Sequence, residues 1–290
     1  MYRALPLLLS LPLALASGCR REPPPSPALA ALLEVALESG GLAAQDATLA
    51  RSELARLAGP ALEALQRGER PSEVFRQALF ARGSFRREID DQQPRFMLLP
   101  GVLRERRGTC VGLGSLYLAL AEAAGVPAHG VLVPGHFFVR VRDGAGPVAN
   151  VELLRQGEPM PDGWYRSKYS VPQRSVSKGA VGPSDREPSD LEPYLRPLTI
   201  AEVTAVLRFN LANELRERGQ PQEALARYRR AAADFPTFAE AHASIGLVEH
   251  MLGRLDEARQ AYGTARQLQP ALPGLERNLA VLDADLEKRK

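Results

Sequence analysis

Residues 108–121, with the sequence GTCVGLGSLYLALA, decide how the central part of this chain folds. Apolar side chains recur in this stretch at the three- and four-residue spacing of one helical face. Thr109 is a residue type that caps helix starts, and Gly125 and Pro127 follow in the order that ends a helix. The pattern therefore predicts a long buried helix with Cys110 in its first turn.

Strand patterns follow this helix at residues 130–133 and 136–142, separated by a Pro-Gly pair. In the second run the side chains alternate with a period of two, which places His136 on the face opposite the valines. A turn rich in glycine then leads to a third run at residues 148–153. A helix packed on an antiparallel sheet is expected, which is an α+β fold.

Cys110 stands where a thiol nucleophile would be assisted. The thiolate is the attacking form, and a free cysteine has a pKa of about 8.5. The positive end of a helix dipole and nearby cations both favour the thiolate. Arg104, Arg106 and Arg107 lie just before Cys110, although arginines at such positions are most often only solvated.

A base and an orienting group follow in the chain. The imidazole of His136 is the candidate base, and Asn150 and Glu152 share one face of the next strand, where either could accept a hydrogen bond from it. We favour Glu152 because a carboxylate also stabilises the imidazolium, and Asn150 is the alternative. Taken singly, a helical cysteine is more often inert packing, a histidine after a turn is more often structural, and a strand glutamate more often faces solvent.

Three motifs in this region resemble the transglutaminase-like superfamily, a branch of the papain-like cysteine enzymes. They are RRGTC at 106–110, GVPAHGVLVPGHF at 125–137 and NVE at 150–152. The resemblance extends over about residues 75–169. It implies a catalytic triad of Cys110, His136 and Glu152, with Asn150 as the other candidate for the third place, acting on a peptide or protein amide without a cofactor.

The chain departs from this family at two points. Core members often have a tryptophan-flanked aspartate as the third residue, and no glutamine precedes Cys110 to build an oxyanion hole, so backbone N–H groups at the helix start are the expected substitute. The PGHF part resembles a bacterial subgroup that often carries tetratricopeptide repeats, many of whose members have proline in place of the thiol. Here Cys110 is present, which is compatible with catalysis.

Residues 1–19 have the pattern of an export signal. Arg3 supplies a positive charge, residues 5–16 are apolar but too short to span a bilayer stably, and the ending LASGC resembles the bacterial lipoprotein signal, in which the cysteine is lipidated. Arg20 resembles sorting to the outer rather than the inner membrane. We therefore expect an exported protein anchored at Cys19 and facing the periplasm, the alternative being an ordinary cleaved signal.

An internal repeat occupies the C-terminal part of the chain. Leu211, Gly219, Ala224, Tyr228, Ala231 and Pro236 recur 34 residues later as Ile245, Gly253, Ala258, Tyr262, Ala265 and Pro270. This is the tetratricopeptide period, which predicts helical hairpins that bind a protein or peptide partner, and residues 274–290 resemble a capping helix. About three repeats are usually needed for independent stability, so the array is expected to dock on the preceding domain.

Length and charge bound the remaining possibilities. A chain of 290 residues suggests two domains, and a net charge of +3 without a basic stripe gives no support for nucleic-acid binding. No residue cluster has the spacing of a metal site. The predicted organisation is a signal peptide at 1–19, a Pro-rich tether at 20–28, a transglutaminase-like domain with a helical N-terminal lobe at 29–170, a linker or draped loop at 171–199, and a tetratricopeptide repeat domain at 200–290.

Two functions fit these patterns. The first is a lipid-anchored cysteine enzyme that transfers or hydrolyses acyl groups at amide bonds, and the sequence does not choose among protease, amidase, deamidase and transglutaminase. The second is a non-catalytic scaffold that holds a protein partner in the envelope. A peptidoglycan amidase would fit the compartment but has no residues of its own in support.

Overall fold

The computed structural model describes residues 26–40, 44–89, 93–171 and 194–289. The predicted signal peptide, the lipidation candidate Cys19, most of the predicted tether and residues 172–193 of the predicted linker lie outside the described residues. In the described ranges, no helix combines the length and the hydropathy that a bilayer crossing requires. The described chain is mainly helical with one small antiparallel sheet, which confirms the α+β fold class.

The elements follow one another in three groups. The N-terminal lobe contains α1 (Pro27–Glu38), α2 (Ala44–Gln66), α3 (Pro71–Phe80), the short helix η1 (Ala81–Gly83), β1 (Arg86–Arg87), α4 (Pro94–Met97), α5 (Leu99–Glu105) and β2 (Arg107–Gly108). The central group contains α6 (Cys110–Ala123), β3 (Ala128–Val133), β4 (His136–Arg142), β5 (Val148–Glu152), η2 (Leu153–Arg155), β6 (Glu158–Pro159) and α7 (Asp162–Lys168). The C-terminal group contains α8 (Ile200–Glu217), α9 (Pro221–Asp234), α10 (Ala239–Met251), α11 (Leu255–Leu268) and α12 (Leu275–Lys288).

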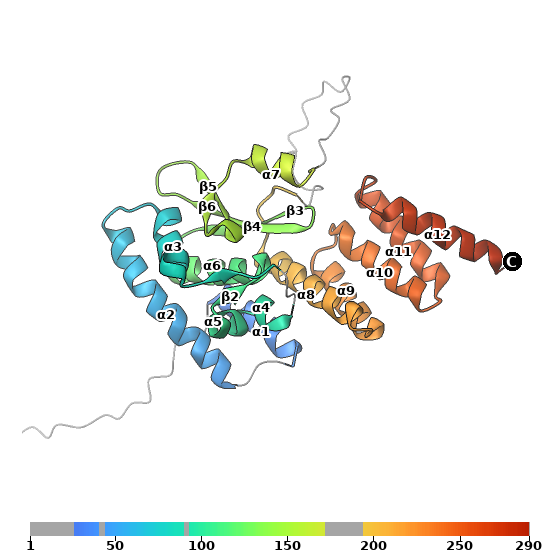
Figure 1. Cartoon of the computed structure of the whole chain (residues 1–290), viewed down its shortest axis with the longest axis horizontal. Helices are drawn as coiled ribbons and strands as arrows, with labels where there is room; N and C mark the ends of the chain where they lie inside the picture. Colours follow the sequence, from blue (N-terminus) through green and yellow to red (C-terminus); the bar gives the residue numbers. More distant parts are fainter. Residues whose placement is uncertain (1–25, 41–43, 90–92, 172–193, 290) are drawn as a thin grey trace, which may run out of the picture.

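The sheet packs against α6, the helix that begins with Cys110. Its four strands are antiparallel in the order β3-β4-β5-β6, while β1 and β2 form a separate parallel pair. An added Cβ at Gly114 would lie 2.4 Å from the ring of Phe137, so this glycine lets α6 approach β4 closely. Figure 1 shows the sheet on one side of α6 and the helices α1, α4 and α5 on the other.

The turn between β3 and β4 fixes where His136 lies. Val133 pairs with His136, so the connection has only two residues, Pro134 and Gly135. Gly135 has φ +67°, a left-handed conformation that suits glycine at the third position of a type II turn, with proline before it. His136 is therefore the first residue of β4, at the end of the sheet.

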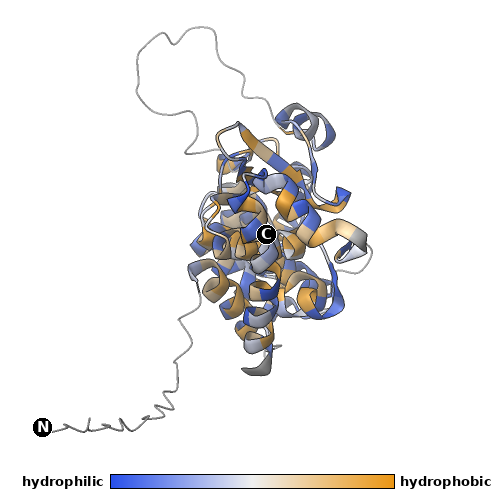
Figure 2. Ribbon diagram, turned by 90° about the vertical axis from the view of Figure 1, so that its left-hand side faces the viewer, coloured by the Kyte–Doolittle hydropathy of each residue, from blue (hydrophilic) through white to orange (hydrophobic). Residues whose placement is uncertain are grey.

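The opposite face of the sheet is covered by α7. The rings of Phe138 and Tyr165 stack with centroids 3.8 Å apart, and both side chains are fully buried. The sheet is thus enclosed between α6 and α7. Figure 2 shows that most helices carry both hydrophilic and hydrophobic residues, as expected for helices that bury one side and expose the other.

The repeats form the predicted helical hairpins, α8 with α9 and α10 with α11, followed by α12. Tyr228 and Tyr262, the matching tyrosines of the two units, are both fully buried. The hydrophobic core around α6 continues into the array, since Val206, Phe235 and Phe238 belong to the same buried cluster as residues of α6. The prediction that the array docks on the preceding domain is therefore confirmed.

Arg208 links the first repeat to the N-terminal lobe. Its guanidinium donates from Nε to Glu38 Oε2 at 2.8 Å and from Nη1 to Asp234 Oδ2 at 3.0 Å, while its side chain is only 4% exposed. We expect Arg208→Leu to lower the free energy of unfolding by about 3 kcal/mol, which is the smallest loss typical of a broken buried ion pair. The loss stays small because water still reaches both carboxylates once the arginine is gone.

Chemical denaturation measures this loss against Arg259→Leu, which removes an exposed arginine whose contact with Asp283 spans 3.4 Å. An exposed pair of this kind contributes at most about 1 kcal/mol. Equal losses in the two variants would contradict the importance of the Arg208 contacts.

Candidate active site

Cys110 is the first residue of α6, as predicted. The hydroxyl of Thr109 accepts a hydrogen bond from the backbone N–H of Gly112 at 3.3 Å, which makes Thr109 the N-cap. The Thr109 N–H itself donates to the carbonyl of Phe96 at 2.9 Å, so the helix start is fixed from both sides. Cys110 is partly buried, and its thiol lies at the positive end of a 14-residue helix.

His136 and Glu152 form a buried pair. His136 Nε2 and Glu152 Oε2 are 2.8 Å apart, and the two side chains are 4% and 1% exposed. The other carboxylate oxygen, Oε1, accepts from the backbone N–H of Leu154 at 3.1 Å. Both oxygens of Glu152 therefore have partners, and the carboxylate holds the imidazole in one orientation.

Asn150, the alternative third residue, does not contact His136. Its Oδ1 accepts from Arg140 Nε at 2.7 Å, and its Nδ2 donates to the Met160 carbonyl at 3.0 Å and to Asp162 Oδ1 at 2.7 Å. The register explains this, since Asn150 pairs with Arg140, two positions further along the sheet than Glu152. The expectation that Asn150 could accept a hydrogen bond from the imidazole is wrong. Asn150 instead binds Arg140 and Asp162.

The thiol of Cys110 completes the arrangement. It lines the same cavity as His136, and it is one of the groups that raise the pKa of this imidazole. Because Nε2 of the imidazole is taken by Glu152, Nδ1 is the nitrogen left to face the sulfur. The structure thus brings together Cys110, His136 and Glu152 in one chain of contacts, from helix to strand to neighbouring strand.

The surroundings of His136 favour its charged form. Burial alone would lower the pKa of the imidazole, but the hydrogen bonds and charges of Cys110 and Glu152 outweigh burial and raise it from 6.5 to about 9. At neutral pH the ring is therefore an imidazolium between a sulfur and a carboxylate. An imidazolium beside a thiolate is the ion pair from which a cysteine nucleophile attacks.

This shift predicts how stability depends on pH. The folded protein keeps the His136 proton up to about pH 9, whereas an unfolded histidine loses it near 6.5, so the folded state binds more protons between these values. The contribution of His136 to the free energy of unfolding should be fully present below pH 6.5 and should be lost as the pH rises to about 9. We expect a fall of about 1–3 kcal/mol.

Denaturation curves across this pH range measure the effect, with His136→Gln as the comparison because glutamine keeps a hydrogen-bonding side chain but does not titrate. The variant should lack the fall. The same pH dependence in both proteins would mean that His136 is not the responsible group.

Aromatic rings form a wall behind the imidazole. Tyr169 stacks on His136 with centroids 4.6 Å apart and an interplanar angle of 5°, and Trp164 meets Tyr169 edge-on at 6.0 Å. Burial and the neighbouring Glu152 carboxylate raise the pKa of Tyr165. These aromatic residues hold the imidazole ring in place, and none of them lines the cavity at the thiol.

The thiol and the imidazole open into a cavity of about 270 Å³. Val111, Gly135 and residues of β3 and β4 form one part of its walls. The repeats form another part, through Phe209 and Asn210 of α8 and Glu240 of α10. Sequence reasoning missed these repeat residues. The only signal for them in the sequence is a polar residue within an otherwise apolar helix pattern. Such a residue does not show which helix face lies against the thiol.

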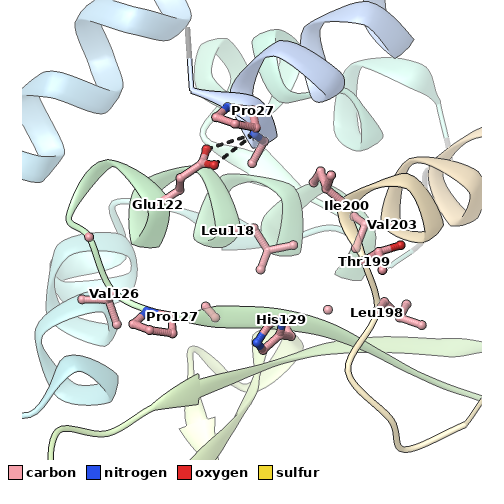
Figure 3. A pocket seen from close by; sticks show the side chains of 14 residues that line it. Pro27, Leu118, Glu122, Val126, Pro127, His129, Leu198, Thr199, Ile200 and Val203 are labelled. Carbon is pink, nitrogen blue, oxygen red and sulfur yellow. Dashed lines mark hydrogen bonds between the residues drawn. The ribbon is translucent and has the colours of Figure 1, made fainter.

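A larger cavity of about 450 Å³ lies at the other end of α6 (Figure 3). His129 projects toward it from β3, and the carboxylate of Glu122 accepts from the Ala28 N–H at 3.0 and 3.2 Å. Glu122 thus binds a backbone N–H in the first turn of α1. No thiol lines this cavity. Across the described ranges, no three His, Cys, Asp or Glu side chains are placed to hold a metal ion.

Comparisons with known proteins agree with this architecture. Residues 48–170 match the transglutaminase-like superfamily, and residues 209–273 match a tetratricopeptide repeat family. Human protein O-mannosyl-transferase TMTC1 is 39% identical over 88 residues, which is 30% of this chain but only 10% of that protein.

Among solved structures, a crystal structure of menin, described as revealing the binding site for Mixed Lineage Leukemia protein, is similar with a TM-score of 0.42 and 14% identity. The similarity covers 83% of this chain and 65% of that one. The family matches carry the assignment: the chain contains a domain of the transglutaminase-like superfamily followed by tetratricopeptide repeats.

Proposed function

We propose that this protein is a cysteine-dependent enzyme that transfers or hydrolyses acyl groups at amide bonds of a peptide or protein. The observation that carries this proposal is the position of His136 between the Cys110 thiol and the Glu152 carboxylate. A thiol, a base and an orienting carboxylate in sequence are the parts that nucleophilic acyl transfer requires. The position of His136 between these two groups favours an enzyme over a non-catalytic scaffold, because a scaffold would not need a base beside the thiol.

The reaction follows from this geometry. The Cys110 thiolate attacks the amide carbonyl carbon, and a C–S bond forms as the carbonyl oxygen takes the negative charge. The N–H groups of Cys110 and Val111 lie in the first turn of α6, where no backbone acceptor is available within the helix, so they can donate to this oxyanion. The C–N bond then breaks as the His136 imidazolium gives its proton to the departing nitrogen.

A thioester remains on Cys110. Water or a second amine attacks it, His136 takes the proton of the attacking group, and the C–S bond breaks to release the thiolate. Glu152 stabilises the imidazolium whenever it forms and holds the ring between sulfur and substrate. Whether water or an amine arrives decides between hydrolysis and transfer.

The N-terminal sequence supports an envelope location. The ending LASGC and the Pro-rich segment after it are typical of a lipid anchor on a short tether. We propose that acyl chains on Cys19 hold the enzyme at a bacterial membrane facing the periplasm. Metabolic labelling with a fatty acid tests this, because Cys19→Ser should abolish the label, and a retained label would exclude this anchor.

Thiol reactivity tests the proposed chemistry. The purified protein is treated with an amide-directed electrophile and with a simple alkylating agent, and the adduct is located by intact mass and peptide mapping. Cys110 should label faster than a free thiol, and His136→Ala should slow this labelling. A rate no faster than that of a free thiol, or one unchanged in His136→Ala, would refute the catalytic proposal.

A further inference from the structure

A second hollow lies beside the thiol cavity, on the repeat array. It encloses about 210 Å³, and its lining includes Ala243, Leu247, Leu272 and Asn278. Phe209 and Glu240 line both this hollow and the cavity that contains Cys110. The two spaces therefore lie on either side of these two side chains, and we call them together the repeat groove.

The walls of the repeat groove have a definite chemistry. Phe209, Leu247 and Leu272 present apolar surface, whereas Asn278 supplies an amide at one side. Such a mixture of apolar walls and a few polar groups suits a chain that buries side chains and offers backbone hydrogen bonds. Both α8 and α10 contribute, so the groove crosses from one repeat hairpin to the next.

Glu240 lines both spaces, and one of its carboxyl oxygens has no hydrogen-bond donor among the described residues. Its Oε1 accepts a hydrogen bond from the hydroxyl of Tyr194, which also contacts Gln269 Oε1 at 3.0 Å. Its Oε2 is buried and has no hydrogen-bond partner among the described residues, and burial raises the pKa of this carboxyl. A buried acceptor without a donor costs free energy, so a ligand that brings an N–H group there would be bound more tightly.

We infer that the repeats form part of the substrate site: an extended polypeptide segment of the substrate lies in the repeat groove, donates an N–H to Glu240 Oε2, and so presents an amide carbonyl to Cys110. This inference rests on the proposed function and adds to it the residues of the repeats that bind the substrate. A polypeptide supplies what the groove lacks, namely apolar side chains for Phe209 and Leu247 and a backbone donor for Glu240.

Two electrophilic probes test the inference. Both carry the same glutamine-derived warhead, one as a capped single residue and the other at the end of a ten-residue peptide of Leu, Ala and Lys. The measured quantity is the ratio of the two labelling rates at Cys110. In the natural protein the long probe should label at least about tenfold faster, the gain expected for one recovered buried hydrogen bond.

Groove variants should reduce this ratio. In Glu240→Gln the amide oxygen can keep the contact with Tyr194 while an NH₂ group replaces the Oε2 acceptor, and Ala243→Phe fills the groove. Each change should lower the ratio about tenfold. The matched controls are Glu257→Gln and Ala226→Phe, at exposed positions that line neither space, and both should keep the natural ratio. A ratio near one in the natural protein, or an equal ratio in variants and controls, would overturn the inference.

A binding measurement separates this inference from the proposed function. Fluorescence anisotropy follows the ten-residue peptide without its warhead. If Cys110 fails to react with either probe but Ala243→Phe still weakens peptide binding relative to Ala226→Phe, the groove inference stands and the enzymatic proposal falls. If the peptide binds neither protein, or binds both equally, the groove inference falls whatever the reactivity of Cys110.

Discussion

Glu152→Gln is expected to lower the turnover of an amide substrate by about 10³- to 10⁴-fold, the range seen when an orienting carboxylate of a catalytic triad becomes an amide. The reason lies in the pair of groups at the imidazole. Glu152 Oε2 accepts from His136 Nε2 at 2.8 Å and stabilises the positive ring. A glutamine has no charge, and its amide can donate an N–H to Nε2. The neutral ring would then carry its proton on Nδ1, and this nitrogen could no longer accept the proton of the thiol.

Steady-state kinetics measure this change, which should appear in kcat because the carboxylate stabilises a charge that develops during the reaction. Glu158→Gln is the control, since the Glu158 side chain is exposed and its carboxylate pairs with the exposed Arg155 at 2.6 Å. The control should keep its turnover within a factor of about two, as surface changes usually do. A Glu152→Gln enzyme with natural kcat would exclude a triad.

Cys110→Ala is expected to remove the covalent intermediate completely and to reduce turnover by about 10⁴-fold or more, since the attacking atom is lost. The fold should tolerate the change, because Cys110 is only partly buried and alanine suits the first turn of a helix. We expect the free energy of unfolding to change by less than about 1 kcal/mol.

Mass spectrometry detects the adduct, and denaturation monitors the fold. The double variant Cys110→Ala with Glu152→Gln sharpens the prediction, because residues that act as one unit are strongly non-additive. The double variant should therefore be no slower than Cys110→Ala alone. Losses that multiply would mean that Glu152 acts independently of the thiol, and turnover retained in Cys110→Ala would place the chemistry elsewhere.

Much of the fold was predictable because its signals are local. The cap at Thr109, the Pro-Gly turn before His136 and the 34-residue repeat each depend on neighbouring residues, and each element appears where these patterns place it. The proximity of Cys110 to His136 required more than local patterns. It came from the resemblance to a family whose helix and sheet are packed in this way, since spacing along a chain does not fix a distance across a core.

The two points that the sequence left open depend on tertiary geometry. Asn150 and Glu152 share a strand face, so only the register with β4 decides which of them meets His136. The contribution of Phe209 and Glu240 to the thiol cavity depends on how α8 and α10 are docked, and amphipathic patterns in helices say which side is buried but not against what.

The shared core of the two domains has a consequence for evolution and engineering. Val206 and Phe235 of the first hairpin and Phe238 and Ala241 at the start of α10 are buried together with residues of α6, so these helices cannot be exchanged as a separate module. A chain truncated before Ile200 would expose this apolar surface to water and invite aggregation. Variation should instead concentrate in α11 and α12, while α8, α9 and the start of α10 are inherited together with the preceding domain.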